Sequence, residues 1–185
     1  SAALLPETDP EKDGLIKREN LGMIEGRTRR DQLDMAKKYG IENPPNAGGG
    51  CLLTEPQFGI KAKDLFEHKK NPTINDIDLL KIGRHFRLDE ETKFVVGRNK
   101  DENEMIKAIA LPDDILLEAK DFVGPVSILR GANLKKHLEF ASSVTLRYSD
   151  APNDKTAIVS IKQSDSVKEI ITETAKEESY IQFRM

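Results

Sequence analysis

Several features are scarce or missing in this 185-residue sequence, and each absence narrows what the protein can be. Tryptophan is absent and aromatic residues make up only 5%, which excludes an extensive aromatic platform for stacked bases. Cys51 is the one cysteine, so no intrachain disulfide can form, and we expect a reducing, cytoplasmic location. No apolar run approaches the roughly 20 residues of a membrane-spanning helix, so we expect no membrane contact.

A surplus of charge of one sign is lacking too. Charged residues make up 33% of the chain, yet the formal net charge is only -3. The parts before and after Gly83 are both close to neutral. Because phosphate affinity depends on clustered cations rather than on net charge, any nucleic-acid contact has to come from a local basic patch.

Helical spacing of apolar residues dominates the first part of the chain, and glycines end the helices. We expect helices at residues 27–38, at 60–68, and from Thr73 or Asn75 to Gly83, with Asn75 a suitable N-cap. The chain begins Ser-Ala-Ala without an initiator Met, so we also expect a fragment of a longer protein.

After Gly83 the pattern changes to the alternation that is typical of strands. Strands are expected at residues 85–88, 93–98, 115–119, 126–130, 157–161 and 180–183, with helices at 101–110 and 134–148. Residues 163–175 fit either a helix or a strand. The sequence therefore predicts an α+β protein, in which a small helical segment (1–83) precedes a compact mixed domain (84–185).

The stretch Phe94–Asn103 holds the most informative turn of the second part. Gly97 leaves a strand and permits close approach of the backbone. Arg98 and Asn99 lie where the strand becomes a helix, and Asn99 can cap that helix. Arg98 together with free backbone amides predicts an anion-binding corner. The alternative is an ordinary strand-to-helix turn with a cap and a surface arginine.

Together with residues 113–130 and the helix that ends at Tyr148-Ser149, this turn resembles the NFACT-R type of RNA-binding domain. The resemblance covers nearly all of residues 84–185 and implies an RNA-binding role. Two positions depart from the family pattern: Glu118 stands where the family has His, and Val126 where it has the His of Pro-Gly-Ser-His. Both changes remove a polar group that can carry a positive charge, which leaves phosphate contacts through Arg98, Lys120 and Arg130.

Cys51 lies in a glycine-rich loop that follows a helix with three arginines at its start: Arg27, Arg29 and Arg30. A loop thiol near cations and free amides can be a thiolate nucleophile. The alternative is a small buried apolar residue, which the following Leu52 and Leu53 favour.

Residues 24–68, with the run Gly-Gly-Gly-Cys51-Leu-Leu-Thr, resemble part of the PP-loop thiouridylases. That resemblance implies that Cys51 is the catalytic thiol that handles sulfur for tRNA. Ala47-Gly48-Gly49 replaces the family's Ser-Thr before this cysteine. The ATP-binding loop of such enzymes is missing from the sequence, so we expect no cofactor in this chain and ATP in an additional N-terminal domain.

The two resemblances, in this order, predict the C-terminal RNA-binding part of a tRNA-modifying transferase similar to 2-thiouridylases or 4-thiouridine synthases, inactive by itself. The expected partners are tRNA and a sulfur-donor protein, with a homodimer as a further option. A non-catalytic protein–protein interaction or dimerisation module is the alternative. The expected RNA-binding residues are Arg27, Arg29, Arg30, Lys81, Arg84, Arg87, Arg98, Asn99, Asn103, Lys120 and Arg130.

The sequence also contains a basic run and three histidines. The basic run from Lys69 to Arg87 is either a hydrated surface between the two parts or a phosphate-contacting ridge. The three histidines, His68, His85 and His137, are far apart in the sequence and flanked by basic residues. We expect them to be solvated surface residues, and we expect no metal site.

Overall fold

The structure, a computed structural model, describes residues 5–22, 24, 29–42, 44, 52, 55–153 and 155–185. The chain forms two compact units, residues 1–50 and residues 51–185. The domain boundary that the sequence suggests at Gly83 stays a prediction. Cys51 and Arg27 lie outside the described residues.

The first unit contains short helices. They are α1 (Asp9–Lys12), the 3-10 helix η2 (Arg18–Asn20) and α2 (Arg30–Lys38). Thr8 and Glu11 cap α1 reciprocally. The helix expected at residues 27–38 is confirmed from Arg30 onward, and Ala36 is its buried residue.

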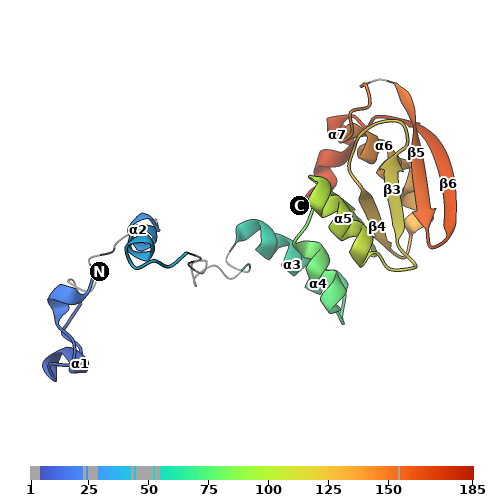
Figure 1. The fold of residues 1–185 in the computed structure, drawn as a ribbon. Coiled ribbons are helices and arrows are strands. Elements are labelled where there is room, and N and C mark those ends of the chain that lie inside the picture. Colours follow the sequence, from blue (N-terminus) through green and yellow to red (C-terminus); the bar gives the residue numbers. More distant parts are fainter. Residues whose placement is uncertain are drawn as a thin grey trace. The chain divides into compact units, whose positions relative to one another are not determined.

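The second unit is built on one antiparallel sheet with the strand order β1-β2-β4-β3-β5-β6 (Figure 1). The strands are β1 (Arg84–Asp89), β2 (Thr92–Val96), β3 (Ile115–Ala119), β4 (Ser127–Gly131), β5 (Thr156–Gln163) and β6 (Ser166–Glu173). Arg84 pairs with Val96 and Arg87 with Lys93, so the expected hairpin is confirmed. Residues 163–175, which fit either structure, supply β6.

Helices cover both faces of this sheet. They are α3 (Pro56–His68), α4 (Ile74–Leu80), α5 (Lys100–Ile109), the 3-10 helix η4 (Leu134–His137), α6 (Leu138–Arg147), α7 (Glu177–Tyr180) and the 3-10 helix η5 (Ile181–Phe183). The mixed α+β fold is therefore confirmed. No helix in the described part of the chain is both long and apolar enough to cross a membrane.

Alternation along the strands sends side chains to two cores. Phe86, Phe94 and Leu117 belong to the larger core, which α6 and α7 close with residues such as Val144 and Tyr180. Val95 and Ile128 point to the opposite face, where α4 and α5 add Leu79 and Ile106. A small third cluster joins α3 to α4 through Leu65 and Leu80.

Two local expectations were wrong. Of the two starts that the sequence allows for α4, Thr73 is confirmed and the N-cap at Asn75 is wrong, because the Thr73 hydroxyl accepts a hydrogen bond from the Asp76 amide. Asn75 lies inside the helix and donates to the Ile109 carbonyl at 3.0 Å. Residues 180–183 are helical rather than a strand, since Tyr180 and Phe183 both turn toward the larger core.

Candidate functional site

The turn between β2 and α5 is shaped by the close approach of three segments. Gly97 donates its amide proton to the Val126 carbonyl at 3.0 Å. A side chain at residue 97 would overlap the Asn103 amide and come within 3.2 Å of the Val126 oxygen. The sequence therefore needs glycine at this position.

Asn103 fastens the loop between β3 and β4 to α5. Its Oδ1 accepts a hydrogen bond from the Val126 amide at 3.0 Å, and its Nδ2 donates to the Gly124 carbonyl at 3.4 Å. Asp150 donates its amide proton to the Val123 carbonyl at 2.8 Å and joins the end of α6 to the same loop. Both polar ends of the Asn103 side chain are thus engaged in building the site.

Asn99 is the N-cap of α5, as the sequence indicates. Its Oδ1 accepts a hydrogen bond from the Glu102 amide at 2.9 Å. The backbone then places Arg98 and Lys100 on either side of the cap, both exposed.

Glu102 holds Arg98 in place. The Arg98 guanidinium and the Arg98 amide both donate to the Glu102 carboxylate, the amide at 2.8 Å, and the Gly83 amide donates to it at 3.2 Å. Burial by itself raises the pKa of Glu102, but these hydrogen bonds from Arg98 and Gly83 outweigh burial and lower it. Glu102 is therefore a carboxylate, and Arg98 keeps half of its side chain exposed.

Arg84 is the first residue of β1 and is held from two sides. Its Nη1 donates to the Gly97 carbonyl at 3.3 Å, and its guanidinium carbon lies 4.7 Å from the centre of the Tyr148 ring. A cation over an aromatic face at this distance is attracted by the ring quadrupole. The guanidinium keeps other N–H groups for a ligand.

Two grooves meet at Arg84 and Arg98. The first groove, of about 440 Å³, runs along the β2–α5 turn past Lys100, Gly124 and Tyr148. The second groove, of about 450 Å³, extends past Lys61, Lys81 and Arg184. We call the cations that line the two grooves the basic ridge: Lys61, Lys81, Arg84, Arg98, Lys100 and Arg184.

The basic ridge concentrates positive charge that the chain does not fully neutralise. Within the described part of the chain, no carboxylate pairs with Arg84, Lys100 or Arg184. Lys81 pairs with Asp78 at 2.6 Å. Burial, and then the nearby charge of Arg98, lower the pKa of Lys61, as expected where like charges gather.

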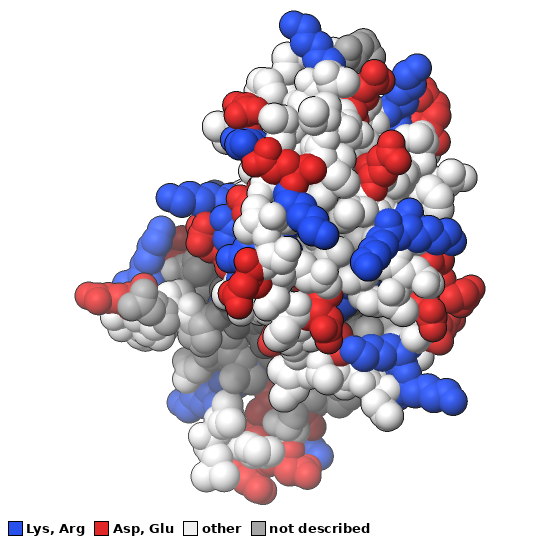
Figure 2. All heavy atoms as spheres, turned by 90° about the vertical axis from the view of Figure 1, so that its right-hand side faces the viewer, with Lys and Arg blue, Asp and Glu red and all other residues white. Residues whose placement is uncertain are grey.

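Figure 2 shows a different distribution on the side of the molecule where β6 lies: Lys and Arg side chains alternate there with Asp and Glu. Lys120, another expected RNA-binding residue, pairs with Glu169 of β6 at 2.7 Å. The cations of that face are mixed with anions and form no field of one sign.

Arg87 and Arg130 serve the fold. Arg87 donates two hydrogen bonds to Asp64, at 2.8 and 2.6 Å. Arg130 donates to Asp114 at 2.6 Å and to the Ile109 carbonyl at 3.2 Å. Both guanidinium groups are mostly buried, so their donors already have partners inside the domain.

Two further residues that the sequence predicts to bind RNA, Arg29 and Arg30, lie in the first unit. Arg29 precedes α2 and donates to Gln32 at 3.3 Å, and Arg30 is the first residue of α2. His85 was expected at the surface, which is wrong: it is 1% exposed, and burial lowers its pKa well below the usual value. No group of three or more metal-ligand side chains occurs among the described residues.

Sequence reasoning missed Lys61, Lys100, Tyr148 and Arg184. Lys100 could have been included, because it is the next residue after the predicted cap. Lys61 and Arg184 carry no local signal, since the fold alone brings residues more than one hundred positions apart to one groove.

Comparisons with known proteins give a family match and a match to a solved structure. A family described as "NFACT protein RNA binding domain" matches residues 83–184. Among solved structures, the chain is similar to the structure of the C-terminal part of the fibronectin/fibrinogen-binding protein from Streptococcus suis. That structure is 14% identical, with 85% of this chain and 78% of that chain covered and a TM-score of 0.48. No curated protein matches the sequence.

Proposed function

The chain belongs to the family of NFACT RNA-binding domains, and from this premise we propose that the basic ridge is the surface that binds RNA phosphates. The observation that carries the proposal is the convergence of six cations on two grooves that share Arg84 and Arg98. Phosphate contacts of this kind supply most of the sequence-independent affinity of RNA-binding proteins.

The geometry favours the backbone of RNA over base stacking at the ridge. Tyr148 is the aromatic residue of the first groove, and its ring is already occupied by Arg84. Arginine forks match phosphate oxygens, and a lysine adds a point charge. The ridge therefore positions RNA without reading its sequence.

Substitutions that each remove one positive charge from the ridge test this proposal. Arg84→Gln, Lys100→Gln and Arg184→Gln should each weaken binding of a short RNA and reduce the slope of log K against log salt by about 0.7, the value for one lost contact to a single strand. Fluorescence anisotropy at several salt concentrations measures both quantities.

Lys168→Gln is the matched control, because β6 lies five strand spacings from β1, about 24 Å. This variant should bind like the parent. If Lys168→Gln lost as much affinity as the ridge variants, or if the ridge variants kept the parental salt slope, the ridge would not be the RNA surface.

We further propose, on the sequence resemblance to PP-loop thiouridylases, that the RNA is tRNA and that Cys51 handles sulfur supplied by a donor protein. In this proposal a separate domain binds ATP, and this chain presents the tRNA. The protein that carries both domains should lose sulfur transfer when Cys51 is replaced by Ser, while its tRNA affinity stays unchanged. Retained sulfur transfer in Cys51→Ser would remove this role.

A second candidate function, dimerisation, is favoured by the free edge of the sheet. β6 pairs with β5 through eight residue pairs without a bulge, and its other side has no partner among the described residues. Val167 and Ile171 of this strand are 61% and 72% exposed. The β1 edge differs, because Arg184 forms a bridge with Phe86 there. Unprotected edges pair readily with other strands.

Ile171→Lys tests dimerisation by placing a charge on the exposed face of β6. Sedimentation velocity should then show a shift from dimer to monomer, whereas Ile74→Lys, at an exposed position on α4, should leave the association unchanged. A parental chain that sediments as a monomer at high concentration would reject this function.

A further inference from the structure

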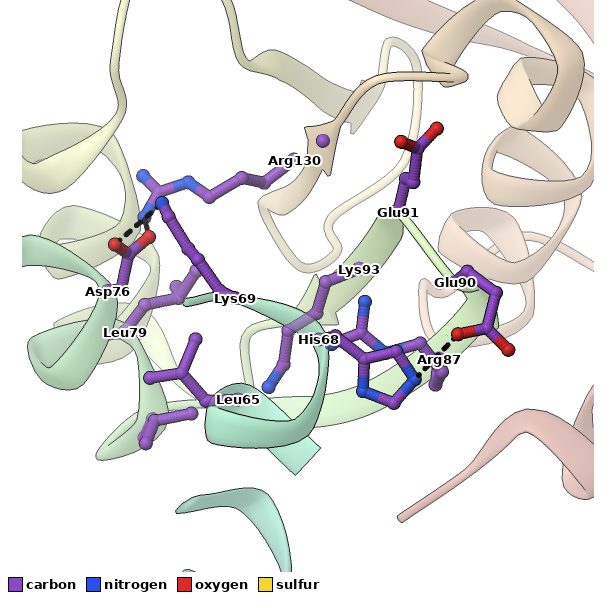
Figure 3. Close-up of a pocket in the computed structure, with 12 residues that line it drawn as sticks. Leu65, His68, Lys69, Asp76, Leu79, Arg87, Glu90, Glu91, Lys93 and Arg130 are labelled. Atoms are coloured by element: carbon purple, nitrogen blue, oxygen red, sulfur yellow. Dashed lines mark hydrogen bonds and ion pairs between the residues drawn. The ribbon is translucent and has the colours of Figure 1, made fainter. Parts of the chain in front are cut away.

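A separate pocket of about 260 Å³ lies between the α3–α4 pair and the sheet (Figure 3). Leucines from both helices form its apolar wall: Leu65, Leu79 and Leu80. Polar and charged side chains from α3, the loop after it, α4, the β1–β2 turn and strands β1, β2 and β4 line the remainder. A cavity of roughly 150 Å³ holds one benzene ring, so this pocket has room for a planar heterocycle of one or two rings.

Charged side chains at this pocket are paired in three groups, one of which is His68 with Glu90 at 3.5 Å, and Glu91 also lines the pocket. Asp64 accepts hydrogen bonds from Arg87 and from Lys93, the latter at 3.1 Å. Asp76 accepts a hydrogen bond from Lys69 at 2.7 Å and lies 3.5 Å from Arg130. Figure 3 shows Asp76 with Lys69 and Arg130 on one side of the gap, and Arg87 and Lys93 on the other. A phosphate would have to break these pairs, whereas a neutral ring with polar edges would not.

Polar atoms at both ends of the pocket can serve such a ring. The Lys93 side chain is 8% exposed, and among the described residues its ammonium group donates one hydrogen bond, to Asp64, although it carries three donors. Burial lowers the pKa of Lys93 to about 8, which makes additional hydrogen bonds from this group favourable. Among the described residues, the Asp76 Oδ1 atom on the opposite side has only the 3.5 Å contact to Arg130, so it can accept a hydrogen bond from an amino group.

The pocket adjoins the basic ridge. Leu80 lines both the pocket and the second groove, which contains Lys61 and Arg84. Leu80 is 2% exposed and forms a wall that the two share, so an RNA strand whose phosphates follow the ridge passes beside the pocket. Apolar side chains hold extruded bases in other RNA-binding and base-flipping proteins, so an aromatic wall is not required.

We propose that the pocket between α3, α4 and the sheet takes one unstacked nucleobase of a single-stranded RNA, with Lys93 donating to a ring carbonyl and Asp76 accepting from an amino group. The inference rests on the proposed RNA binding and adds to it a site for bases beside the site for phosphates.

Methyl NMR of the full chain with labelled leucines tests the proposal. A short single-stranded RNA, an abasic strand with the same number of phosphates, and nucleoside 5′-monophosphates are titrated separately. We expect the methyl signals of Leu65 and Leu79, which line the pocket but not the second groove, to shift with the RNA and with nucleotides but not with the abasic strand. The amide signals along the ridge should shift with both strands.

Lys93→Met removes the donor and leaves Asp64 paired with Arg87. It should weaken binding of the base-containing RNA roughly tenfold, the effect of one hydrogen bond to a charged group, and leave the abasic strand unaffected. Lys168→Met is the control for loss of one lysine. The dispersion of the amide spectrum reports whether each variant is folded.

The outcomes separate the two proposals. Ridge shifts without leucine shifts would overturn the base pocket alone. Leucine shifts with nucleotides, in the absence of any binding to either strand, would reject the ridge and would also overturn the pocket as a site for a base of RNA, because it would then take free nucleotides alone. Equal leucine shifts with the abasic and the base-containing strand, or equal losses for both strands in Lys93→Met, would also overturn the pocket.

Discussion

At Gly97 the backbone leaves β2 and passes so close to α5 that a side chain would overlap the Asn103 amide. The same Asn103 holds the β3–β4 loop through Val126 and Gly124. One residue without a side chain thus allows three segments to meet beside the ridge.

Gly97→Ala should therefore destabilise the second unit by about 1–3 kcal/mol, the usual cost of forcing extra volume into packed structure. Thermal unfolding measures the loss. Gly22→Ala is the control, because a side chain there meets atoms no closer than 3.5 Å. Equal melting temperatures for Gly97→Ala and the parent would show that the turn can open.

Acid stability depends on Asp64, whose side chain is 10% exposed. Burial raises its pKa, but Arg87 and Lys93 outweigh burial and lower it to about 2. A lowered carboxyl pKa stabilises the fold above the unfolded value of about 4, and this stabilisation, about 2 kcal/mol, is lost as the pH falls from about 4 through 2.

Denaturant unfolding between pH 2 and 7 should show this loss in the parent chain. Asp64→Asn should flatten the curve over that range and lower it at pH 7, because Arg87 and Lys93 lose a charged partner. Asp165→Asn, in the exposed β5–β6 turn, should keep the parental pH dependence. If the free energy of unfolding of Asp64→Asn changed with pH as steeply as that of the parent, groups other than Asp64 would cause the acid sensitivity.

The sequence placed Arg98 and Asn99 at a strand-to-helix turn with Asn99 as the cap, and the structure agrees, because this signal is local. The RNA-binding role of Arg84 and Arg98 stays a prediction. The sequence could not separate these two arginines from Arg87 and Arg130. The carboxylates that neutralise those two arginines are 23 and 16 residues away, and only the fold brings them together.

At the scale of elements, α3 and α4 are bound to the sheet although they precede the residues that match the family. Leu79 of α4 packs with Val95 and Ile128 of the sheet. Ion pairs from Asp64 and Asp76 reach Arg87, Lys93 and Arg130 on the strands. The two helices contribute to the same folded body.

A chain that begins at Gly83 should accordingly be less stable than residues 55–185 by at least 3–5 kcal/mol, about the cost of leaving a buried charge without its partner. Urea denaturation and amide hydrogen exchange of the two lengths measure the difference. Equal midpoints would instead support the domain boundary that the sequence suggests at Gly83.

Long periodic elements were predictable from the sequence, and short ones were not. The β1–β2 hairpin and α5 agree with their alternation and capping signals. Residues 180–183 are too few to show a period, and Tyr180 and Phe183 fit a strand or a turn of helix equally. Packing of Tyr180 against Phe86 and Tyr148 decides for the helix.

At the scale of the whole molecule, the net charge of -3 predicts that RNA binding is modest and sensitive to salt. Three or four ridge cations that contact phosphates should lower the affinity for single-stranded RNA roughly 20- to 50-fold between 50 and 200 mM salt. Anisotropy titrations check this range. A much steeper decline would require cations beyond the ridge.

Glu102 competes with RNA phosphates for Arg98. Its carboxylate accepts hydrogen bonds from the Arg98 guanidinium and from the Gly83 amide. It therefore lies where an RNA phosphate would bind the same guanidinium. Each phosphate that takes Arg98 must displace it, and the start of β1 is then released from α5 in proportion. Glu102→Gln should thus raise RNA affinity while it speeds hydrogen exchange at Gly83, two changes that a simple surface arginine would never link.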